Sequence, residues 1–118
     1  MTGVRVAISL FFAAVCAACG GAIRPVDVDV RYDACSFCRM TVSNRHLAAQ
    51  IAGRGAEPLF FDDFGCLSNY LKEHSVDADQ VVYVADHRSG DWIDARRAVF
   101  SRLPSGATPM ASGRGVPL

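Results

Sequence analysis

The segment Val81-Val82-Tyr83-Val84-Ala85-Asp86 is the clearest strand of the chain, because β-branched and aromatic residues follow one another without a break. Residues 87–91 then form a turn, and residues 92–95 run back as the partner strand. Earlier in the chain, the glycine-rich turn 53–58 separates two apolar runs at 47–52 and 59–62, which we read as a hairpin. These segments predict a small, mostly antiparallel sheet.

One amphipathic helix is expected between the hairpin and the long strand, over residues 62–74. Asp63 is its expected N-cap, and apolar residues follow at helical spacing. A single helix covering one face of the sheet gives an α+β fold with a ββαβ-like order of elements. Cys66 becomes the third helical residue, where the free amides of the helix start favour a thiolate. The alternative is a small buried apolar residue.

The motif Cys35-Ser36-Phe37-Cys38-Arg39-Met40 gathers three sulfur side chains within six residues. Two thiols separated by two residues can close around one ion, and Met40 would share a face with Cys38 if the chain continued as a strand. Thiolate with thioether is a soft ligand set that favours copper(I). Spacing alone also allows a redox dithiol, a disulfide, or a structural zinc site completed by Cys66 and one of three histidines: His46, His74 or His87.

The first residues of the chain are typical of an export signal. Residues 1–18 combine one arginine with an apolar run and small residues, too short for a comfortable membrane span. The sequence Val15-Cys16-Ala17-Ala18-Cys19 resembles a bacterial lipoprotein processing site with Cys19 as the lipidated residue, and plain cleavage without lipid is the alternative. Residues 19–33 are then expected to form a lipid-anchored tether, or to add an edge strand at 26–30.

The composition narrows the class of protein further. Basic and acidic residues number 12 each and are mixed along the chain, so no basic stripe is available for nucleic acid. One small domain is expected over residues 34–103, and the Gly-, Pro- and Ser-rich segment 104–118 predicts a flexible tail. No nucleophile elbow or His/Asp pairing indicates hydrolysis, so we do not expect an enzyme.

In order and spacing, several blocks of the chain resemble the NosL family of lipoprotein copper chaperones, which are associated with assembly of nitrous oxide reductase in denitrification. No single block is specific, whereas the ordered series covers almost all of the mature chain. The residues that carry the likeness are Cys19, Cys35-x-x-Cys38-x-Met40, Ala48-Ala49-Gln50-Ile51, Phe61-Asp62-Asp63-x-Gly65-Cys66-Leu67, Tyr83-Val84-x-Asp86, Trp92-Ile93-Asp94-Ala95 and Thr108-Pro109-Met110-x-x-Gly113.

The resemblance implies a membrane-anchored protein of the cell envelope that faces the periplasm and delivers copper(I) to an apo-cuproenzyme or its assembly machinery. The chain departs from the family pattern in two ways. Arg39 stands where relatives usually have glycine, and relatives continue beyond the Thr-Pro-Met block with a second small unit that is incomplete here. The uncovered sheet edge is then open to a partner, for example a second copy in a homodimer. The implied copper ligands are Cys35, Cys38, Met40, Met110 and, as a weaker candidate, His46.

Overall fold

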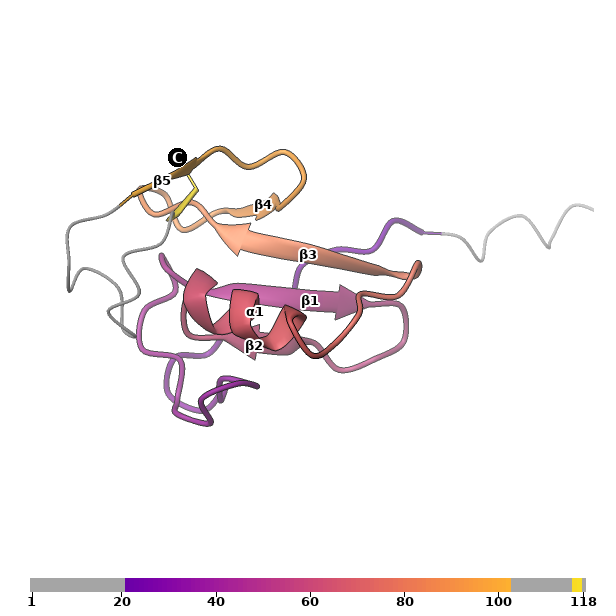
Figure 1. The fold of residues 1–118 in the computed structure, drawn as a ribbon, viewed down its shortest axis with the longest axis horizontal. Helices are drawn as coiled ribbons and strands as arrows, with labels where there is room; N and C mark the ends of the chain where they lie inside the picture. The colour runs from indigo at the N-terminus through magenta and orange to yellow at the C-terminus, as the bar shows by residue number, and fades with distance from the viewer. Residues whose placement is uncertain (1–20, 103–115, 118) are drawn as a thin grey trace, which may run out of the picture.

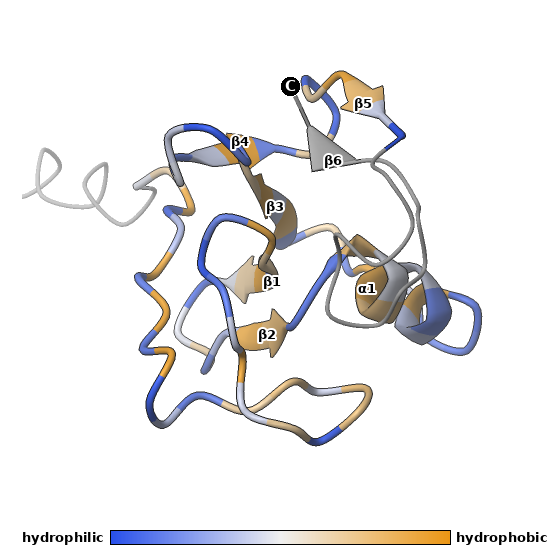
Figure 2. Ribbon diagram, turned by 90° about the vertical axis from the view of Figure 1, so that its left-hand side faces the viewer, coloured by the Kyte–Doolittle hydropathy of each residue, from blue (hydrophilic) through white to orange (hydrophobic). Residues whose placement is uncertain are grey.

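The computed structural model describes residues 21–102 and 116–117 (Figure 1). Four strands form one antiparallel sheet in the order β2-β1-β3-β4, and one helix, α1, follows β2 in the chain. The helix covers one face of this sheet (Figure 2), which confirms the α+β class. The elements are β1 (Ala49–Gly53), β2 (Leu59–Phe61), α1 (Phe64–Leu71), β3 (Gln80–Ala85) and β4 (Trp92–Asp94).

The main core lies between the sheet and α1. Side chains alternate between the two faces of a strand, so Ala49 and Ile51 of β1 share the helix-covered face. Phe61 is paired with Ala49 in the register of the hairpin, and Leu67 of the helix packs into the same cluster. Phe61 and Leu67 are almost completely buried. Each contributes about 1.5–3 kcal/mol of burial free energy, which fixes the helix on the sheet.

The opposite face of the sheet is covered by the N-terminal segment 21–33 (Figure 2). The fully buried Gln50 holds this segment, because its amide accepts from the Val26 N–H at 2.9 Å and donates to the Val26 carbonyl at 2.7 Å. Tyr83 also donates to the Ile23 carbonyl at 2.6 Å. Residues 21–33 therefore form neither an edge strand nor a free tether, since buried polar groups of the sheet are satisfied by their backbone.

The helix begins and ends close to the predicted residues. Asp63 is the N-cap, and its carboxylate accepts a hydrogen bond from the backbone of Cys66. The helix ends at Leu71, three residues before the predicted limit. His74 still donates its backbone N–H to the Tyr70 carbonyl, so the chain keeps one more closed turn after the helix.

The last described part of the chain is a small separate sheet. β5 (Phe100–Ser101) pairs antiparallel with β6 (Val116–Pro117), two residues that the sequence analysis placed in the tail. Phe100 packs on Phe64, the first residue of α1, with ring centroids 4.8 Å apart. Residues 1–20, 103–115 and 118 lie outside the described residues, and with them the expected signal segment, Cys19 and Met110.

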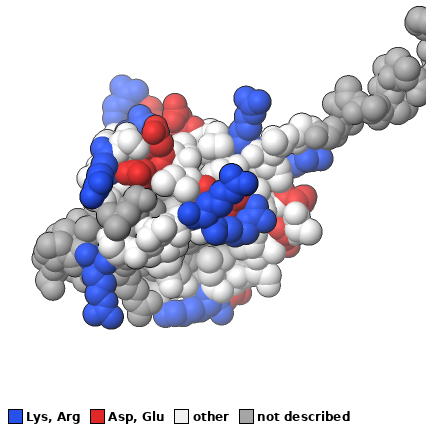
Figure 3. Space-filling view, turned by 90° about the horizontal axis from the view of Figure 1, so that it is seen from above, with Lys and Arg blue, Asp and Glu red and all other residues white. Residues whose placement is uncertain are grey.

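Basic and acidic side chains are interspersed on the face drawn in Figure 3, so neither sign of charge dominates that face of the described part. This pattern matches the balanced composition of the sequence. Within residues 21–102 and 116–117, no helix has the length and apolar character needed to cross a bilayer.

Candidate metal centre

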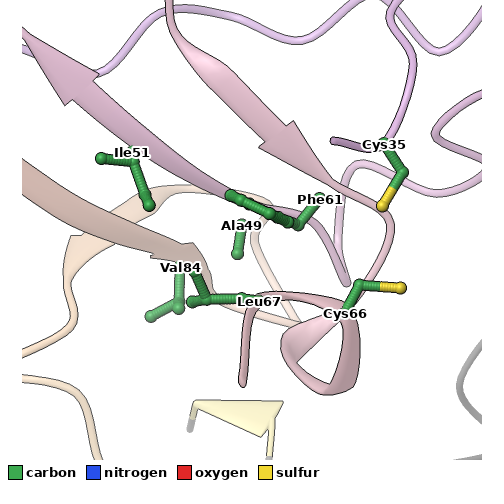
Figure 4. Close-up of a cluster of buried hydrophobic side chains, with 7 residues drawn as sticks. All are labelled: Cys35, Ala49, Ile51, Phe61, Cys66, Leu67 and Val84. Atoms are coloured by element: carbon green, nitrogen blue, oxygen red, sulfur yellow. The ribbon is translucent and has the colours of Figure 1, made fainter. Parts of the chain in front are cut away.

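Three thiols from two distant parts of the chain meet beside the start of α1. The Sγ atoms of Cys35, Cys38 and Cys66 all lie within 4.8 Å of one another, and none of the three is in a disulfide. Figure 4 shows the sulfurs of Cys35 and Cys66 on the same side of the helix start, at the edge of the main core. The structure therefore assembles a compact cluster of three sulfur donors.

Two of the three thiols belong to a short loop that is attached to the edge of the sheet. Within the loop, Cys35 donates its N–H to the Met40 carbonyl at 2.7 Å, and Arg39 donates to the Cys35 carbonyl at 3.0 Å. Ser36 donates to the carbonyl of Phe60 in β2 at 2.8 Å. The loop thus covers the edge strand β2 and fixes Cys35 against the core.

After the cysteine loop, the chain does not continue as the strand that would place Met40 beside Cys38. Arg39 has a φ of +67°, in the left-handed region that glycine adopts freely and other residues seldom occupy. Beyond it, a single bridge between Ala34 and Thr41 replaces the predicted strand. The period-two argument that placed Met40 beside Cys38 therefore does not apply. Met40 is 63% exposed, and its role as a ligand stays a prediction.

The third thiol is positioned by the N-terminus of the helix. The Asp63 carboxylate accepts from the Cys66 N–H at 2.9 Å, which fixes Cys66 as the third helical residue, as predicted. The neighbouring Asp62 carboxylate accepts from both the N–H and the hydroxyl of Ser43, at 2.8 and 2.9 Å. This pair of bonds joins the chain after the cysteine loop to the start of the helix, so the two halves of the cluster are tied together.

The electrostatics of the cluster distinguish one thiol from the other two. Burial raises the pKa of Cys35, but three backbone amides and the Cys38 thiol together outweigh that effect and leave the pKa below the ordinary thiol value of 9.0. These amides belong to Phe37, Cys38 and Asp62, and the one of Cys38 lies 3.5 Å from the Cys35 sulfur. Burial raises the pKa of Cys38 and, much further, that of Cys66. Cys35 is therefore the first of the three to become a thiolate.

The expectation of a favoured thiolate at Cys66 is wrong. Its burial raises the pKa most, followed by the negative charge and hydrogen bond of Cys35 and the charge of Asp63. These effects exceed that of the helix amides, because a buried anion beside two other acids loses more hydration than one short helix restores. Cys66 is therefore the last of the three thiols to lose its proton as the pH rises. The helix-start motif points to this residue, although the sequence analysis considers Cys66 as a metal ligand only in the structural zinc alternative.

The histidines lie apart from the thiols in the described part of the chain. His46, the weaker candidate ligand, has its Nδ1 3.1 Å from the His87 carbonyl and its Nε2 against Gly90. His74 has its Nδ1 3.1 Å from the Tyr70 carbonyl and stacks on the Tyr70 ring. The structure brings neither ring to the cluster. The placement of His46 therefore departs from the expectation that this residue joins the sulfur ligands.

The geometry of the cluster suits a metal ion of low coordination number. A thiolate-bound zinc-sized ion lies roughly 2.3 Å from each sulfur, so three ligands in a plane are roughly 4.0 Å apart. The observed sulfurs, within 4.8 Å of one another, need to approach by at most about 1 Å to reach this arrangement. Side-chain rotation at the half-buried Cys38 can supply that movement, because the two buried thiols are held by the core.

Fold and site together define a small α+β domain with a buried thiol cluster suited to a soft metal ion. A family model described as NosL matches residues 25–108, well over half of the chain. The chain therefore belongs to the NosL family. No curated protein and no solved structure matched the chain in the same comparisons.

Proposed function

We propose that the protein is a copper(I)-binding chaperone that delivers copper to an exported cuproenzyme. The observation that carries this proposal is the cluster of three free thiols within 4.8 Å, two of them buried. Membership of the NosL family supports the same function. Thiolate sulfur is soft, and soft ligands select cuprous copper over hard cations.

The ligand set also favours copper(I) over structural zinc. Structural zinc is almost always held by four protein ligands in a closed tetrahedron. Among the described residues the group of possible ligands contains Cys35, Cys38 and Cys66 and no histidine or carboxylate. A three-sulfur site leaves one side of the ion open, and an open side is what an incoming ligand of a recipient needs.

Release of the metal depends on how the three thiols differ in exposure. Cys35 and Cys66 are 0% and 1% exposed, whereas Cys38 is half-buried. The exposed Met40 lies two residues after Cys38 in the chain, and a thioether is a weak, exchangeable copper ligand that carries no proton. We propose that copper leaves through Cys38 and Met40. Met110, outside the described residues, is a further proposed thioether ligand.

We propose that the protein works at the outer face of a membrane, anchored through a lipid at Cys19. The lipoprotein-like sequence at residues 15–19 supports this localisation. Three residues lie between Cys19 and Ile23, whose carbonyl accepts a hydrogen bond from Tyr83, and the four chain steps from residue 19 to residue 23 span at most roughly 14 Å. The domain would then lie close to the membrane of the cell envelope, facing the periplasm, where apo-nitrous oxide reductase or its assembly machinery would receive copper.

The experiment that tests this function follows copper between two proteins. The full chain is loaded with copper(I), mixed with an apo-acceptor that presents sulfur ligands, and the copper content of each protein is measured after separation. A chaperone gives up its copper and keeps its circular dichroism spectrum when empty. Copper that stays on the chain, or a domain that unfolds on losing it, would contradict the proposal and favour a structural metal site.

A further inference from the structure

The thiols of the cluster are unequal in their access to solvent. Cys38 is half-buried, whereas Cys35 and Cys66 are buried at the edge of the core (Figure 4). A reagent larger than a metal ion therefore meets the Cys38 sulfur first. Because the three sulfurs are within 4.8 Å, any bond formed at Cys38 lies next to a second thiol that can displace it.

Cys35 is better placed than Cys66 to complete such a reaction. Cys35 and Cys38 share one turn, in which the Cys38 N–H lies 3.5 Å from the Cys35 sulfur. Cys66 is held at the helix start by the bond from its backbone to Asp63. A disulfide requires sulfurs about 2.05 Å apart, and a short surface loop can close that gap with less disturbance than a capped helix. The favoured disulfide is the one within the loop.

We propose that this cluster has a second class of reaction partner besides a metal ion, namely an accessible disulfide, which oxidises Cys35 and Cys38 to an internal disulfide and switches metal binding off. This inference rests on the proposed function, because it concerns regulation of the same site. Cys38 attacks the external disulfide, forms a mixed disulfide and releases one thiol. Cys35 then attacks the Cys38 sulfur and releases the second thiol.

The reaction is balanced. One external disulfide gains two electrons and two protons and leaves as two thiols, while the two protein thiols lose the same electrons and protons. The oxidised protein keeps only Cys66 of the three sulfur donors, so the soft-metal site is lost. A dithiol reductant reverses both steps and restores the site. Once oxidised, the metal-free protein therefore needs a reducing partner before it can take up copper.

The test uses the full chain, metal-free and fully reduced, exposed to oxidised glutathione, quenched with an alkylating reagent and digested with trypsin. Cleavage after Arg31 and Arg39 leaves Cys35 and Cys38 on one peptide, 32–39, whereas Cys66 lies on the peptide 55–72. The proposal expects the disulfide inside peptide 32–39. A crosslink between the two peptides as the main product, or no protein disulfide at all, would overturn it.

Two variants and one binding measurement complete the test. Cys38→Ser should slow oxidation at least about tenfold, because the remaining thiols are buried, and Cys66→Ser should still form the disulfide inside peptide 32–39. Oxidised wild type should lose copper(I) uptake and regain it after treatment with dithiothreitol. Equal uptake by oxidised and reduced protein would overturn the inference. Failure of the reduced protein to bind copper would instead overturn the proposed function, and with it the switch, even if the disulfide forms.

Discussion

Replacing Arg39 with glycine should stabilise the domain. Arg39 lies between the second cysteine and Met40, with a φ of +67° that its Cβ disfavours. Its side chain is exposed, so the substitution removes little packing. The NosL resemblance places glycine at this position, which agrees with the backbone conformation that the structure shows here.

The size of the effect follows from two opposing contributions. A left-handed conformation costs a residue with a Cβ roughly 1–2 kcal/mol, and glycine avoids that cost. Glycine also gains freedom in the unfolded chain, which removes about 0.4–1 kcal/mol of the benefit. The net expectation for Arg39→Gly is a gain of about 0.5–1 kcal/mol in the free energy of unfolding. For a domain of this size that gain corresponds to an increase in Tm of about 2–8 °C.

Thermal and urea denaturation of the reduced, metal-free protein measure this change. Arg39→Ala is the matched control, because it removes the charge and keeps the Cβ, and Arg39→Asn should fall between, since asparagine tolerates this conformation. A stability gain in Arg39→Ala equal to that in Arg39→Gly would refute the reasoning from strain and assign the effect to charge. A loss of stability in Arg39→Gly would refute it outright.

Three further predictions concern the surroundings of the cluster. Asp63→Ala should lower the free energy of unfolding by about 1–2 kcal/mol and weaken copper binding through Cys66, whereas Asp63→Asn should keep the cap. Urea denaturation measures the stability of the two variants, and copper titration measures their affinity. Equal losses in Asp63→Ala and Asp63→Asn would contradict the capping role. The pKa values of Cys38 and Cys66 are raised by burial, so their contribution to stability is present below the ordinary value of 9.0 and is lost as the pH rises above it. Urea denaturation of the reduced, metal-free protein should therefore show falling stability above about pH 9, less steeply in Cys66→Ser, and a flat profile in the wild type would contradict this. His46→Ala should leave copper(I) affinity unchanged and cost about 1 kcal/mol of stability through the lost contact with the His87 carbonyl; a large loss of affinity would restore His46 as a ligand.

Local pattern was enough to predict most of the sheet and the helix. The run at 81–86 is recognisable because its β propensity is continuous, and the two glycines of the turn 53–58 separate strands that do pair. Asp63 was identified as a cap because the cap interaction is formed by residues three apart in sequence. Strands, turns and helix caps, which are formed by residues close together in sequence, can therefore be predicted from the sequence alone.

Features that depend on long-range contacts were not readable in the same way. The alternation at 26–30 predicted a strand or tether, but buried Gln50, distant in sequence, binds the backbone there instead. The thiolate preference at Cys66 was wrong, since burial and the adjoining Cys35 arise only when the loop and the helix meet. Sequence identified two thiols by their spacing and left the third undecided, because nothing local joins residue 35 to residue 66.

The central claim, that clustered thiols bind copper(I) and can release it, is tested most directly by competition with a copper(I)-specific chelator under reducing conditions. The account predicts that the wild type withholds copper from the chelator and that Cys35→Ser/Cys38→Ser loses this ability, while His46→Ala retains it. Equal binding by the wild type and the double variant would contradict the account.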